Sequence, residues 1–96
     1  MKARLLVWRK LYIQNRYIME MKLYEVPRSV FYGEGVKYRL VLADLQTGRR
    51  VLMDNHRPKG PHIHIDQTEF AYAFRGREQL FSDFQKLAFE HLGVRL

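Results

Sequence analysis

The sequence predicts an α+β fold, in which one C-terminal amphipathic helix packs on a single curved antiparallel sheet of about four to six strands. Three observations predict it. Apolar and polar residues alternate at period two through most of the chain, and the period changes to that of a helix near residue 77. The chain has 96 residues, 47% of them hydrophobic, which is enough for one core. We therefore expect a single domain over 1–96, with 1–74 mainly β-sheet and 75–96 containing the helix.

The first two strands are predicted at Arg9–Ile13 and Arg16–Val26, joined by a turn at Gln14-Asn15. In the second strand, every other residue falls on one apolar face: Tyr17, Met19, Met21 and Leu23. Trp8 follows Val7 before an alternating strand, and we expect its side chain in the core. The basic residues near the N-terminus are expected on the solvated face of an edge strand, with a phosphate-tracking surface as the alternative: Lys2, Arg4, Arg9, Lys10 and Arg16.

Two central strands and two short ones complete the predicted sheet. The clearest alternation covers Val36–Leu45, and a hairpin loop at 46–48 leads from it into Arg49–Asp54. After a polar loop with two prolines and a glycine, Ile63–Ile65 and Phe70–Phe74 each have the composition of a short strand.

The helix is predicted over residues 77–92. Its apolar stripe follows the 3.6-residue period, and Gly93 stands where a C-terminal capping glycine is favoured. The stripe is formed by Leu80, Phe81, Phe84, Leu87, Ala88, His91 and Leu92. Such a stripe must be buried, and the sheet is the only other layer that the sequence offers.

Several classes of protein are excluded by composition. No apolar run approaches the ~18 residues of a membrane span, so no membrane association of that kind is expected. The apolar stretch near the N-terminus is too short for a signal peptide. Cysteine is absent, which excludes disulfide scaffolds and thiolate chemistry and fits a cytoplasmic protein.

The charge balance points to a polyanionic partner. Seventeen Lys and Arg residues against ten Asp and Glu give a net charge of +7. A field of this sign steers a protein toward nucleic acid or an acidic protein, while the alternative is that the basic residues only keep a small domain soluble. Association of the chain with itself also stays open.

The segment Asp54–Asp66 contains three of the four histidines, together with two cations. If residues 62–66 are extended, His62, His64 and Asp66 project from one face while Ile63 and Ile65 point into the core. Clustered titratable groups at a junction of loop and strand are typical of a small functional site.

Four interpretations of this segment remain open. The first is a Zn²⁺ or Mn²⁺ site made of His62, His64 and Asp66 or Asp54, although neighbouring cations disfavour it. The second is metal-independent cleavage of RNA, which needs a base, an acid and a cation and no cofactor. The third is binding of a phosphate backbone without chemistry, and the fourth is a purely structural role for the histidines.

The sequence favours the ribonuclease interpretation. His62 and His64 are then the acid–base pair, with Cβ atoms about 6–7 Å apart, so that a phosphate fits between the ring tips. Lys59 or Arg57 is assigned to the phosphate. Asp54 either orients an imidazole or only ends a strand and bonds the loop backbone. Contacts with the nucleic acid are assigned to a further set of residues: Arg49, Arg50, Arg57, Asn55 and His56.

Three segments resemble the TumE family of small toxins from prokaryotic toxin–antitoxin systems. They are Met1–Leu6, Lys37–Val41 and, above all, Asp54-Asn55 followed by Lys59-Gly60-Pro61-His62-Ile63-His64. The resemblance extends over nearly the whole chain, and His56 departs from the family pattern. It implies a toxin encoded beside an antitoxin that carries a helix-turn-helix DNA-binding domain. The signature positions carried over are Asp54, Asn55, Lys59, Gly60, His62 and His64, with Gly60 serving the backbone.

Overall fold

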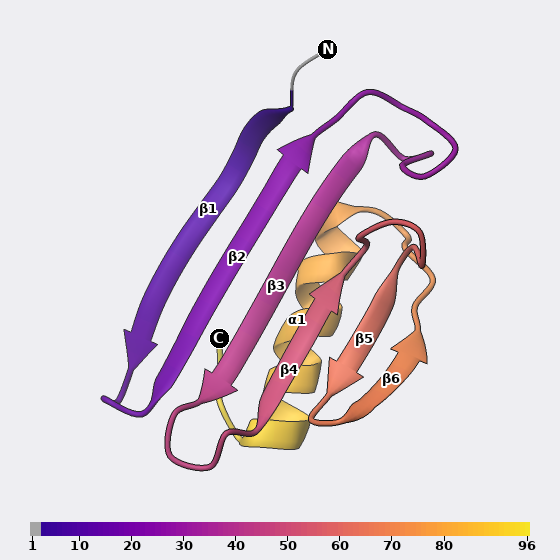
Figure 1. Cartoon of the computed structure of the whole chain (residues 1–96). Coiled ribbons are helices and arrows are strands. Elements are labelled where there is room, and N and C mark those ends of the chain that lie inside the picture. The colour runs from indigo at the N-terminus through magenta and orange to yellow at the C-terminus, as the bar shows by residue number, and fades with distance from the viewer. Residues whose placement is uncertain (1–2) are drawn as a thin grey trace.

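Six antiparallel strands follow one another across a single open sheet in the order of the chain, and one helix packs on one of its faces. The computed structural model describes residues 3–96. The elements are β1 (Arg4–Ile13), β2 (Tyr17–Glu25), β3 (Val36–Asp44), β4 (Arg50–Asp54), β5 (His62–Ile65), β6 (Thr68–Ala71) and α1 (Arg77–Leu92). This is the predicted α+β fold class, and Figure 1 shows the meander with α1 behind it.

Helix α1 has the bounds that its period predicts. Its apolar stripe buries Leu80, Phe84 and Ala88 against the sheet. The helix ends at Gly93, whose φ of 68° is the left-handed conformation that glycine adopts without strain, and whose N–H donates to the carbonyl of Phe89. No helix within residues 3–96 is both long and apolar enough to cross a membrane.

The core lies between α1 and one face of the sheet, which we call the covered face. Alternate residues of β2 to β4 point into it and are almost completely buried, among them Leu23, Leu40, Leu42, Val51 and Met53. In β5, Ile63 and Ile65 pack against this core, as predicted. The other residues of each strand therefore point to the opposite face, which carries no helix and which we call the open face.

The structure corrects the prediction at both edges of the sheet. Strand β1 begins at Arg4 rather than Arg9, and Trp8 is 59% exposed instead of buried in the core. Trp8 pairs with Lys22 in register, which places it on the open face. Strand β6 ends at Ala71 rather than Phe74. Lys2 of the basic N-terminal group lies outside the described residues.

One ion pair joins the turn between β1 and β2 to the end of β3. Asp44 at the end of β3 is 4% exposed, and its carboxylate accepts two hydrogen bonds from the guanidinium of Arg16, at 3.0 and 2.8 Å. It also accepts the backbone N–H of Gln46 at 2.9 Å. These bonds hold the pKa of Asp44 well below its usual value, because they stabilise the charged form.

Candidate functional site

Strand register brings residues that are distant in sequence into one row on the open face. The row crosses the sheet from β1 to β5 through Trp8, Lys22, Arg39, Asp54 and His62. Aromatic, cationic and acid–base side chains therefore lie side by side. The next row contains Lys10, Glu20, Val41, Leu52, His64 and Glu69. The candidate site is the β4–β6 end of these two rows.

His62 is the most enclosed member of the site. Its side chain is 9% exposed, its Nε2 lies 2.9 Å from Oδ1 of Asp54, and its Nδ1 lies 2.7 Å from the carbonyl oxygen of Gly60. Both ring nitrogens thus face oxygen atoms, one of a carboxylate and one of a backbone carbonyl. Gly60 has a φ of 77°, which agrees with the backbone role predicted for it.

His64 stands edge-on against His62 on the same side of β5. The ring centroids are 4.7 Å apart with an interplanar angle of 76°, so the two imidazoles touch. The predicted gap that would admit a phosphate between the ring tips is wrong, because ring contact fills it. His64 is half-buried, and within residues 3–96 its ring nitrogens have no hydrogen-bond partner.

Lys59 and Glu69 form the outer wall of the site. The ammonium of Lys59 donates to both carboxylate oxygens of Glu69, at 2.9 and 3.0 Å. These bonds, together with the charge of the Lys59 ammonium, lower the pKa of the Glu69 carboxyl. Sequence analysis missed Glu69. The signal was the two-residue turn at Asp66-Gln67, which places Glu69 opposite His64 in the β5–β6 hairpin.

Asp66 does not extend the histidine face. Strand β5 ends at Ile65, and Asp66 adopts a φ of 55° in the turn, which aims its carboxylate toward the β3–β4 loop. There it accepts the backbone N–H of Arg50 and pairs with Arg49 at 3.1 Å. The Arg50 N–H and the Arg49 guanidinium lower its pKa. The side chain of Arg50 itself is exposed on the open face.

The loop between β4 and β5 brings two more predicted residues to the rim. A hollow of about 300 Å³ opens beside the Asp54–His62 pair, and its lining comprises Asp54, His56, Arg57, Pro58, Lys59 and His62. His56 and Arg57 are exposed. The guanidinium of Arg57 lies 5.4 Å from the centre of the Phe31 ring, a cation–π arrangement that orients this side chain at the rim.

Asn55 has a structural task. It is 7% exposed, its Oδ1 accepts the backbone N–H of Tyr38 at 2.9 Å, and its Nδ2 donates to the carbonyl of Val36 at 2.8 Å. Its amide thus continues the β3–β4 hydrogen-bond ladder by one step beyond Asp54. Both polar atoms of this buried amide bond the backbone of β3, so its predicted contact with nucleic acid lacks geometric support.

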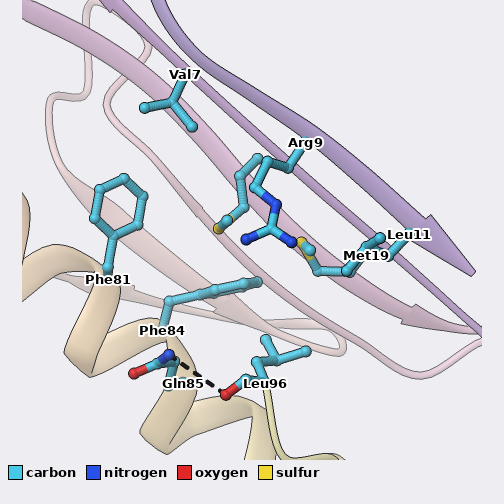
Figure 2. A pocket seen from close by; sticks show the side chains of 9 residues that line it. Val7, Arg9, Leu11, Met19, Phe81, Phe84, Gln85 and Leu96 are labelled. Carbon is cyan, nitrogen blue, oxygen red and sulfur yellow. Dashed lines mark hydrogen bonds between the residues drawn. The ribbon is translucent and has the colours of Figure 1, made fainter. Parts of the chain in front are cut away.

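A second hollow lies on the covered side, where the sheet extends beyond the helix. A cavity of about 330 Å³ separates β1 and β2 from α1. Figure 2 shows its apolar walls and the guanidinium of Arg9 pointing into the space between sheet and helix. Its lining includes Val7, Arg9, Leu11, Met19, Met21, Phe81, Phe84 and Leu96.

Comparisons of the chain with protein-family models, with curated proteins and with solved structures found no match. The functional argument therefore depends on the geometry. An Asp–His pair, a second imidazole in ring contact with it and an adjoining row of cations form a site suited to acid–base or metal-assisted chemistry on a phosphate ester.

Proposed function

We propose that this protein is the toxin of a prokaryotic toxin–antitoxin pair of the TumE type, and that it binds and cleaves RNA on the open face of its sheet. The observation that carries the proposal is the continuous row from Trp8 through Lys22 and Arg39 to the Asp54–His62 pair. Single-stranded nucleic acid is bound in other proteins by this combination of an aromatic platform and cations.

The dimensions of the row suit a short single-stranded segment. Four inter-strand spacings separate Trp8 on β1 from His62 on β5, which amounts to roughly 19 Å. Lys22 and Arg39 lie between them and can neutralise phosphates along this path. The indole N–H of Trp8 donates to Glu20 at 3.1 Å, which holds the ring on the face. This bond, and to a smaller extent the nearby cations, lower the pKa of Glu20.

Cleavage is assigned to the end of the row where Asp54, His62 and His64 meet. Because the two rings touch, the site acts as one compact centre rather than as an acid and a base on either side of a phosphate. Lys59 and the exposed Arg57 and His56 stand at the rim, where an incoming phosphate would approach. Arg50 extends the cationic surface on the same face.

The binding experiment uses Trp8, the only tryptophan in the chain, as its own reporter. Titration with a single-stranded oligonucleotide of RNA should quench its fluorescence, and the affinity should fall steeply with salt. Lys22→Ala and Arg39→Ala should weaken binding and reduce the salt slope by about one each. Lys86→Ala, an exposed cation on α1, is the matched control and should bind like the wild type. Equal losses in all three variants would contradict the open-face path.

The cleavage experiment compares toxicity and RNA decay. Expression of the wild type should arrest growth, and the purified protein should shorten total RNA. His64→Ala should abolish both and still quench Trp8 fluorescence on addition of RNA. A wild-type protein that quenches but never cleaves would instead make the chain a non-catalytic RNA-binding module, the second candidate that the open face favours.

The antitoxin is proposed to occupy the cavity between β1–β2 and α1, together with the free edge of β1. The side chains along this edge strand include Arg4, Arg9 and Lys10, and residues 3–16 contain no acid. A second copy pairing there would bring like charges together, whereas an acidic amphipathic segment complements them. Arg9→Glu should therefore abolish co-purification with the antitoxin, whereas Arg39→Glu on the open face should retain it. Retention by Arg9→Glu would move the antitoxin elsewhere.

A further inference from the structure

We propose that Asp54, His62 and His64 together bind one divalent transition-metal ion, with Zn²⁺ the best fit. Of the two predicted third ligands, Asp66 lies in the turn after β5, whereas strand register brings Asp54 next to His62. The bound ion would be the cofactor of the proposed cleavage, so this inference extends the proposed function. The existence of the site does not depend on that activity, because the ion can be measured directly.

The positions of the donor atoms carry the inference. One carboxylate oxygen of Asp54 and one ring nitrogen from each histidine all lie within 4.8 Å of one another. Zinc bonds of 2.0–2.1 Å at the tetrahedral angle place ligand atoms about 3.3 Å apart. The Asp54–His62 separation is already 2.9 Å, so rotations of the side chains are enough to close the site. Two nitrogens and one oxygen are a ligand set that Zn²⁺ and Mn²⁺ accept.

His62 is oriented as a metal ligand is. A histidine bound to metal through one nitrogen usually donates the other N–H to a backbone carbonyl or a carboxylate, which fixes its tautomer and direction. The Nδ1 of His62 has this partner in Gly60, at 2.7 Å. Its Nε2 is thereby aimed at Asp54, so both groups can turn a donor atom toward one ion beside them.

The positive charges of the loop cations are partly offset by other groups. Lys59 and Arg57 both line the hollow beside His62, and each already has a partner there. The ammonium of Lys59 is neutralised by Glu69, and the guanidinium of Arg57 lies over Phe31. Glu69 also adds a carboxylate beside His64. Arg39, opposite Asp54 in register, is the facing cation that remains, and its side chain is exposed to solvent.

Three protein ligands leave one position of a tetrahedral ion for water or substrate, which distinguishes catalytic from structural zinc sites. The hollow beside Asp54 and His62 opens to solvent and would give access to that position. An ion held there would lower the pKa of a bound water toward neutral pH, so that the water oxygen could form a bond to phosphorus while the bond from phosphorus to the leaving ribose oxygen breaks. The proton lost by the water would pass to solvent, and the leaving oxygen would take a proton from solvent. The cationic row of the open face leads a phosphodiester to this point.

The test is calorimetric titration of the full-length protein with Zn²⁺ after dialysis against EDTA. We expect one ion per chain. Asp54→Asn and His64→Gln should each weaken binding by roughly 100-fold or more, since even the loss of an outer partner costs about 10–100-fold. His56→Gln and Asp66→Asn are matched controls that change the same residue types a short distance away, and both should bind Zn²⁺ like the wild type.

A second readout keeps the test valid if a variant is destabilised. Co²⁺ in place of Zn²⁺ should give the wild type a visible absorption spectrum of tetrahedral type with nitrogen and oxygen ligands, and His56→Gln should give the same spectrum. Wild-type protein without stoichiometric Zn²⁺ binding, or equal weakening in His56→Gln, would overturn the site. Zinc binding without RNA cleavage would support the metal site and contradict the proposed ribonuclease activity. Undiminished cleavage in EDTA by a chain that binds zinc would overturn the ion's role as cofactor.

Discussion

The covered face and the open face of the sheet differ in the burial of the side chains that they carry. On the covered face, residues such as Leu40, Leu42 and Met53 are fully buried, and close packing restricts the volume and shape of each side chain. On the open face, the intervening strand positions carry exposed or half-buried groups such as Trp8, Lys22 and Arg39, while Leu52 and His62 on this face are buried. A strand of this protein therefore contributes to stability through one set of residues and to recognition through the set between them.

This separation has a practical consequence. Substitutions on the covered face should change folding first, whereas substitutions at the exposed positions of the open face should change binding with little effect on folding. Each prediction below tests one side of that comparison.

The largest effect is expected in the core of the covered face. Phe84 of α1 is 1% exposed, and Phe84→Ala leaves a cavity that the sheet cannot close. The free energy of unfolding should fall by about 3–5 kcal/mol, measured by urea denaturation. Phe89→Ala, on the exposed side of the same helix, should change it by less than about 0.5 kcal/mol. A small change in the free energy of unfolding for Phe84→Ala would mean that α1 does not cover the core.

The next effect concerns Asp44, where the ends of two hairpins are joined. Its folded pKa is depressed by Arg16, so its contribution is fully present above the unfolded value of about 3.9 and is lost as the pH falls toward the folded value. The thermal midpoint of the wild type should therefore drop in acid, and Asp44→Asn should begin lower and vary less with pH. Glu78→Gln is the control. Parallel curves for Asp44→Asn and wild type would exclude the pair as the cause.

On the open face, Trp8→Ala separates binding from folding. Stacking of one base on an aromatic ring contributes about 1–3 kcal/mol, so affinity for single-stranded RNA should fall roughly five- to 150-fold. The free energy of unfolding should change by less than about 0.5 kcal/mol, because Trp8 is 59% exposed. Binding is measured here by fluorescence anisotropy of labelled RNA. A large loss of stability would place Trp8 with the core after all.

The smallest effect is a gain on the covered face. The hydroxyl of Tyr38 is buried, and among the described residues it has no hydrogen-bond partner. Tyr38→Phe should therefore raise the free energy of unfolding by up to about 1 kcal/mol. Tyr72→Phe should do the opposite, because the hydroxyl of Tyr72 donates to Asp83. Burial raises the pKa of both tyrosines, so neither result should change near neutral pH.

Most of the fold could be predicted from local periodicity. The helix bounds and the inward direction of Ile63 and Ile65 follow from period and capping, which need no knowledge of partners. Trp8 could not be placed in this way, because the side to which a residue of an edge strand points depends on its register with β2. The chain before Arg9 was too weakly alternating to extend the strand.

The sequence predicts most residues of the candidate site but not how they are arranged. His62 and His64 do share a side of β5, but sequence proximity favoured Asp66 as their neighbour, and the turn at that position carries it away. Asp54 joins them through the β4–β5 pairing, which depends on the geometry of the loop between the strands. The side-chain amide of Asn55 is a group that often binds ligands, and only the structure reveals that it is hydrogen-bonded to the backbone of β3.

That amide makes one backbone proton unusually informative. The N–H of Tyr38 lies within β3 but is held by the side chain of Asn55, the first residue of the loop that leads to the histidines. Its exchange with deuterium can therefore proceed when the loop detaches, without rupture of the pairing between β3 and β4. Compared with the N–H of Leu40 farther along the strand, it separates loop opening from global unfolding. A ligand that closes the loop should slow exchange at Tyr38 while leaving Leu40 unchanged.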